Sequence, residues 1–118
     1  MDAQTCHNIS GVSYYHQARS SEGLSSILIT RLLRSIDPET LCTYCRHWNQ
    51  FKDWMARRKM CISQVTVNVI GLFLVHMFEK GYAYSSLNSI RSALSFFIGK
   101  NVNIGSDDSL SRLFKYLL

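Results

Sequence analysis

The cysteine and histidine side chains are the residues of this chain best suited to metal chemistry. Cys42 and Cys45 form a CxxC pair, and His47, Cys61 and His76 follow it. A structural zinc ion takes four ligands, and no second CxxC or HxxxH pair completes the set. We therefore interpret the cysteines as small buried thiols, and we expect neither a metal ion nor another cofactor.

Aromatic residues offer two further kinds of chemistry. Trp48, Phe51 and Trp54 could stack on the bases of a single nucleic-acid strand, but their spacing is typical of one buried helix face. We favour a place in the core. Tyr116 could act as a nucleophile, yet no base or arginine cluster lies near it in the sequence. The sequence thus predicts no catalytic residue, and we expect that the chain alone is not an enzyme.

The balance of charge favours a polyanionic partner. The chain has 13 lysine and arginine residues against 8 aspartate and glutamate residues, for a formal net charge of +5. Basic surfaces gain affinity by neutralising phosphates, although such charge can also serve solubility alone. Charge by itself therefore leaves nucleic acid as one of two alternatives.

The apolar content indicates one folded domain, and the first residues indicate a protein outside the secretory pathway. Of the 118 residues, 47% are apolar, enough for a single core. The first residues lack a signal-peptide run, so we expect reduced thiols and a nuclear protein if eukaryotic, otherwise a cytoplasmic one. The apolar stretch 65–78 is too short to cross a bilayer, which takes about 20 residues. We expect no membrane partner.

Periodicity predicts an all-α fold with four to five short helices around one core. Residues 1–23 show little periodicity, and we interpret them as a flexible arm that precedes a helical domain over 24–118. Asp37 and Pro38 are typical of a helix start, as is Ser85 or Ser86. The predicted helices cover 24–35, 38–59, 65–80 and 85–98, with a last one from Asp107 or Asp108 to the chain end.

Three of these helices have predicted packing faces. The first should bury a stripe that recurs at three- and four-residue steps, and the third is apolar nearly all round, as expected at the centre of a bundle. The fourth should turn one apolar face inward. The predicted stripe of the first helix is Leu24, Ile27, Leu28, Leu32 and Ile36, and that of the fourth is Leu87, Ile90, Ala93, Leu94, Phe97 and Ile98.

Four motifs together resemble one family, the tyrosine recombinases and phage integrases, in their N-terminal SAM-like core-binding domain. The resemblance covers about four-fifths of the chain, and its wording is most like versions from eukaryotic mobile elements. Ile70 and Phe73 are three residues apart, which departs slightly from the usual spacing of the family motif. The motifs are Ser35-Ile36-Asp37-Pro38-Glu39-Thr40, Tyr44-x3-Trp48-x2-Phe51-x2-Trp54, Val69-Ile70-x2-Phe73-Leu74-x6-Gly81 and the block from Tyr84 to Ser95.

The resemblance implies a compact orthogonal helix bundle that forms half of a C-shaped clamp on duplex DNA. The second and fourth helices would then lie in or across the major groove. In this family a separate C-terminal domain carries the arginine-histidine-arginine-tyrosine set that cleaves DNA for recombination or integration. Nothing in this chain matches that set, so the resemblance implies a non-catalytic half.

The candidate DNA contacts come from the polar sides of the second and fourth helices. Arginine contacts phosphates or guanine edges, and small serines let a helix approach the backbone closely. A solvated polar face is the alternative for each residue, and Arg91 could instead pair with Asp53 or Glu79. The candidates are Thr43, Arg46, His47, Gln50 and Arg57 on the second helix, and Ser85, Ser86, Asn88, Ser89, Arg91 and Ser92 on the fourth.

Double-stranded DNA is therefore the expected partner, with no small-molecule substrate. Self-association on DNA would use the first and last helices, as the family resemblance implies. The alternative function is a domesticated helical module that binds protein, or itself, without binding DNA. A partner whose binding does not depend on salt would favour that alternative.

Overall fold

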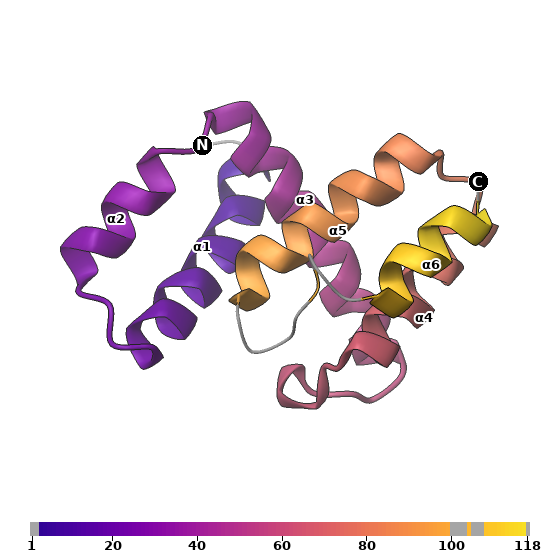
Figure 1. Ribbon diagram of the computed structural model, residues 1–118. Helices are drawn as coiled ribbons and strands as arrows, with labels where there is room; N and C mark the ends of the chain where they lie inside the picture. Colours follow the sequence, from indigo (N-terminus) through magenta and orange to yellow (C-terminus); the bar gives the residue numbers. More distant parts are fainter. Residues whose placement is uncertain (1–2, 100–103, 105–107, 118) are drawn as a thin grey trace.

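The structure, a computed structural model, describes residues 3–99, 104 and 108–117 (Figure 1). These residues form helices and no strand, which confirms the predicted all-α class. None of the described helices is long and apolar enough to cross a membrane. The elements are α1 (Ala3–Ser21), α2 (Ser26–Arg34), α3 (Pro38–Arg57), the 3₁₀ turn η1 (Ile62–Gln64), α4 (Val67–Glu79), α5 (Tyr84–Ile98) and α6 (Asp108–Leu117).

The first helix, α1, corrects the prediction of a flexible arm over residues 1–23. Ala3–Ser21 is helical and packs on α2, α3 and α5, with Tyr15 and Arg19 buried. A Cβ added at Gly11 would lie 3.0 Å from Cys45 Sγ, so α1 packs closely against α3 at this point. The arm prediction failed because the helix is polar overall and docks through a few residues, which leaves no clear apolar period.

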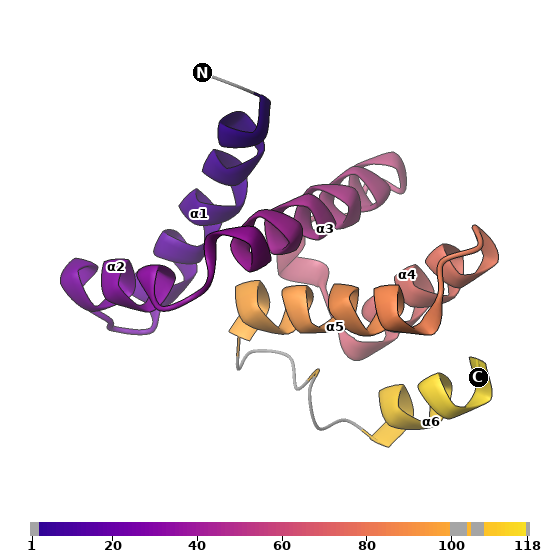
Figure 2. The ribbon, with the colours of Figure 1, turned by 90° about the horizontal axis from the view of Figure 1, so that it is seen from above.

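Helix α2 corresponds to the predicted helix 24–35, and its packing face differs from the predicted one. Ser25 caps it, accepting a 3.3 Å hydrogen bond from the Leu28 backbone N–H. Ile29 and Leu33 are the buried residues, whereas Ile27, on the predicted inward stripe, is 72% exposed. The reason is that α2 packs mainly on α1 and lies at one end of the molecule, opposite α6 (Figure 2). Helix α2 therefore carries more apolar side chains than its contacts with the rest of the core can bury.

Helices α3 and α5 occupy the centre of the bundle. Helix α4, which was predicted to lie there, does not. Asp37 caps α3 as predicted, accepting hydrogen bonds from the Glu39 and Thr40 N–H groups at 3.1 and 3.2 Å. Helix α4 begins at Val67, and its Leu72 and Phe78 are exposed. An apolar sequence all round predicts burial on every side, but no helix among the described residues covers the side of α4 that bears Leu72 and Phe78.

Helix α5 confirms its predicted inward face, since Leu87, Ile90, Ala93, Leu94, Phe97 and Ile98 are all buried. Its predicted cap is wrong, because the helix begins at Tyr84 with Ala83 at the cap position, so neither Ser85 nor Ser86 caps it. Gly81 supplies the turn before it, with a positive φ of 100°. The predicted cap Asp107 of the last helix lies outside the described residues, and Asp108 is the first residue of α6.

Candidate nucleic-acid interface

Helices α3 and α5 lie side by side and run in opposite directions (Figures 1 and 2). Near the start of α3, Thr40 and Tyr44 share a shallow groove of about 460 Å³ with Arg91 and Ser92 of α5. Further along α3, Gln50 Nε2 donates a 3.2 Å hydrogen bond to the hydroxyl of Tyr82, just before α5. The polar edges of the two helices therefore meet along one surface of the bundle.

Buried His47 is one end of a hydrogen-bonded chain that runs through Gln50 to Tyr82, and its burial corrects an expectation. Its side chain was expected on the exposed side, but the residue is only 8% exposed. Its Nδ1 lies 3.1 Å from Gln50 Oε1. Because that oxygen only accepts, the Nδ1 N–H must donate. His47 therefore helps to orient Gln50, which in turn bonds Tyr82.

Burial also sets the charge of His47. Desolvation lowers the pKa of the ring below its ordinary value of 6.5, and the nearby Arg46 lowers it further. The hydrogen bond to Gln50 raises the pKa, but by less than desolvation lowers it. The ring is therefore neutral at neutral pH, and the positive charge of this edge comes from arginine.

The predicted contacts on α3 form a stripe along the helix. Arg46 is exposed, and its Nη2 donates a 3.4 Å hydrogen bond to Thr43 Oγ1. Thr43, Gln50 and Arg57 are seven residues apart, so they lie on one face over about 21 Å. Arg57 is exposed in the last turn. The stripe thus has a cation near each end.

The predicted contacts on α5 are mostly half-buried small groups. Arg91 is half-buried and lines the groove shared with α3, with its Nη2 donating a 3.1 Å hydrogen bond to Asn88 Oδ1. The bond fixes the guanidinium on the helix surface. Ser85 is exposed, and Ser86, Asn88, Ser89 and Ser92 are half-buried.

Several groove and pocket residues were absent from the predicted contacts. Thr40 and Tyr44 line the same groove as Arg91. The spacing Thr40, Thr43, His47 marks one side of α3 and could have indicated Thr40. Tyr82 could not have been found, because its bond to Gln50 joins residues 32 positions apart.

The thiols and aromatic side chains have mainly structural places. Cys45 is buried, and burial together with the nearby Cys42 raises the pKa of its thiol to about 11. Cys61 is exposed, so the buried interpretation is wrong for that residue because it lies at the solvated start of η1. No cluster of metal-binding side chains occurs among the described residues. Trp48, Phe51 and Trp54 are buried, as the core interpretation predicted.

Comparison with known families identifies the class of this fold. Residues 28–99 match the family described as phage integrase, N-terminal SAM-like domain. The match covers more than half of the chain and runs from α2 to the end of α5, so the protein belongs to this family. It covers an integrase N-terminal domain and no catalytic domain. No curated protein and no solved structure matches the chain.

Proposed function

We propose that this domain binds duplex DNA for a tyrosine-recombinase-like protein and clamps the target site for recombination or integration. Cleavage would belong to a separate catalytic domain. The observation that carries the proposal is the groove in which Thr40 and Tyr44 of α3 meet Arg91 and Ser92 of α5. Two helices that present polar edges together can follow one strand of a duplex, whereas edges on opposite sides of a bundle cannot.

The chemistry of this surface suits the DNA backbone better than base edges. Arg46, Arg57 and Arg91 supply the charge that neutralises phosphates, while the serines of α5 allow the helix to approach closely. Gln50 and Asn88 are both engaged within the protein, through Tyr82 and Arg91. Base readout is therefore limited, and specificity in the full clamp would need further contacts.

Fluorescence anisotropy of a labelled duplex tests the proposal. Non-specific binding by a module of this size should have a Kd of about 10⁻⁴ to 10⁻⁶ M near physiological salt. With about three to five phosphate contacts, the slope of log K against log salt should be about −3 to −4.5. No binding at about 1 mM protein, or affinity unaffected by salt, would reject DNA binding.

Self-association is the second candidate function, and the outer side of α2 favours it. Ile27, Leu28 and Leu32 are all exposed large apolar residues on one short helix. Apolar groups gathered on a surface in this way often mark an interaction site. Sedimentation velocity would decide the question. A dimer that Ile27→Ser abolishes supports self-association, and a monomer at about 100 μM without DNA counts against it.

A further inference from the structure

A pocket between the C-terminal ends of α3 and α4 gathers positive charge. Its volume is about 320 Å³. Arg57 and Arg58 line it from the end of α3, and His76 and Lys80 from the end of α4. Asp53 is the single acid on its wall. The pocket thus has three permanent cations for one carboxylate.

No carboxylate neutralises these cations through an ion pair in the part of the chain that the structure describes. Among the residues that the structure describes, none of Arg57, Arg58 and Lys80 forms an ion pair, not even with Asp53. The two helix ends contribute roughly half a negative charge each. With the carboxylate, these offset only about two of the three cations. A net positive charge therefore remains and faces the pocket.

One cation of the pocket lies over an aromatic side chain in its wall. Trp54 is 7% exposed, and the Arg58 guanidinium carbon lies 4.7 Å from the centroid of its ring. The buried Trp54 Nε1 has no hydrogen-bond partner among the described residues. An arginine held over an aromatic ring loses less side-chain entropy when it binds an anion.

The pocket continues the interface that α3 and α5 form. Gln50 belongs to both, since it lines the pocket and donates to Tyr82. Arg57 is likewise a pocket residue and the last member of the stripe that begins at Thr43. A strand that follows this stripe toward the end of α3 therefore passes over the pocket opening.

From this geometry we propose that the α3–α4 pocket binds a backbone phosphate of the duplex. The inference rests on the proposed DNA-binding function and extends its surface from α5 to the end of α4. A phosphodiester is the ligand chemistry that fits, because clustered arginine and lysine side chains bind phosphate oxygens and the seat is concave. A free inorganic phosphate shares that chemistry, and the experiments below separate the two sources.

The first experiment compares two exposed lysines in duplex binding at about 50 and 200 mM salt. Lys80→Gln removes a pocket cation, and Lys115→Gln on α6 removes the same charge elsewhere. Loss of one phosphate contact should make the salt slope shallower by about 0.9 and weaken binding about 15-fold at 50 mM and about four-fold at 200 mM. Lys115→Gln should leave both values near those of the wild-type chain. Thermal melts show whether both variants fold.

Equal effects of the two substitutions, in a wild-type chain that still binds duplex, would overturn the pocket proposal and leave the proposed function intact. A wild-type chain that binds no duplex would overturn both. Lys80→Gln with an unchanged slope also rejects the pocket, because the charge would then make no contact with a phosphate.

The second experiment follows the indole N–H resonances of the two tryptophans by NMR. Trp54 lines the pocket, whereas Trp48 is buried in the core and serves as an internal control. Duplex should shift the Trp54 resonance and leave Trp48 nearly unchanged. If inorganic phosphate shifts Trp54 and duplex does not, the pocket takes only a small anion and the proposal of a DNA contact fails.

Discussion

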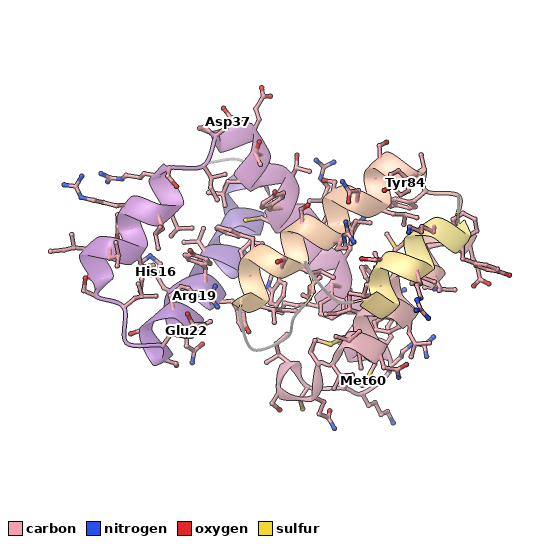
Figure 3. The ribbon with its side chains drawn as sticks, in the orientation of Figure 1. His16, Arg19, Glu22, Asp37, Met60 and Tyr84 are labelled. Carbon is pink, nitrogen blue, oxygen red and sulfur yellow. The ribbon has the colours of Figure 1, made fainter. Side chains whose placement is uncertain are left out.

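Arg19 of the first helix donates a 3.3 Å hydrogen bond to the backbone carbonyl of Phe97, at the end of α5. The same guanidinium also donates to the carbonyls of Phe96 and Ile98 at 3.1 and 3.2 Å, and it pairs with Glu22 at 3.1 Å. Figure 3 shows Arg19 directed from α1 toward the end of α5. A side chain outside the matched region 28–99 therefore satisfies the carbonyls that end a helix of the candidate interface.

The Arg19 contact predicts a large loss of stability on substitution. Arg19→Met would leave three nearly buried carbonyls and Glu22 without their donor, and should lower the free energy of unfolding by about 2–4 kcal/mol. Arg31→Met removes an exposed arginine from α2 and should change it by less than about 0.5 kcal/mol. Urea unfolding measures both. Similar values for the two variants would show that the cap contributes little.

Gly99 gives an independent test of the same cap. Its φ is 75°, and an added Cβ would lie 2.5 Å from Arg19 Nη2. Gly99→Ala should therefore destabilise the fold by about 1–3 kcal/mol through backbone strain and displacement of the guanidinium. Gly81→Ala has a positive φ of 100° but open space around it, so its loss should be smaller. Thermal unfolding of the two variants, run side by side, checks the order.

The neutral His47 ring predicts how stability depends on pH. Because its pKa is lower in the folded protein than the ordinary 6.5, the unfolded chain binds a proton first as the pH falls. The contribution of His47 is fully present above 6.5 and is lost as the pH falls through the lowered pKa of the folded state. Unfolding free energy should thus decrease as the pH falls below 6.5, toward the lowered pKa of the folded state.

A variant isolates that contribution from the other histidines. His47→Gln has no titrating group at this position, so its unfolding free energy should fall less over the same pH range. Parallel curves for the two proteins would contradict the assignment of this pH dependence to His47. The measurement is urea unfolding at several pH values.

The thiols should differ sharply in reactivity. Cys61 is exposed, whereas Cys45 is buried with a pKa raised to about 11, so little thiolate forms there near pH 8. Iodoacetamide should modify Cys61 at least about ten times faster than Cys45 in the folded protein. Peptide mapping by mass spectrometry reads the sites. Equal modification rates of the two thiols in native buffer would show that the core around Cys45 opens readily. Equal rates in denaturant alone would not.

Binding and folding should separate between Arg91 and Trp48. Arg91→Ala is expected to weaken duplex binding several-fold and to leave the melting temperature nearly unchanged, since the side chain lines a surface groove. Trp48→Ala removes a fully buried indole and should cost about 3–5 kcal/mol, enough to unfold a marginal domain. If Arg91→Ala lowered stability as much and left affinity per folded molecule unchanged, Arg91 would be a structural residue.

The sequence predicts those parts of the fold whose signals are local. Asp37 and Pro38 mark the start of α3, and the inward face of α5 follows from its helical period. Long-range contacts have no such signal. Helix α1 is polar, and its docking depends on Arg19 meeting carbonyls 77 to 79 residues away. The packing face of α2 was missed for the same reason, because its main partner is α1.

The candidate site, too, could be predicted where its signals are local and not where it depends on long-range contacts. Which helices carry the polar residues follows from periodicity and from the family resemblance. How far each side chain is exposed does not, as His47 shows, since its burial depends on how α3 meets the neighbouring helices. The α3–α4 pocket was also beyond prediction, because it joins Arg58 and Lys80 from two helix ends.

Backbone NMR during a duplex titration can show whether α3 and α5 together form a single cationic surface for DNA. Shifts should gather along Thr43, Gln50 and Arg57 and, at the same DNA concentrations, along Ser89 and Ser92. The exposed side of α2 around Ile27 should stay unchanged. Shifts confined to one of the two helices, or centred on α2, would contradict a shared DNA surface.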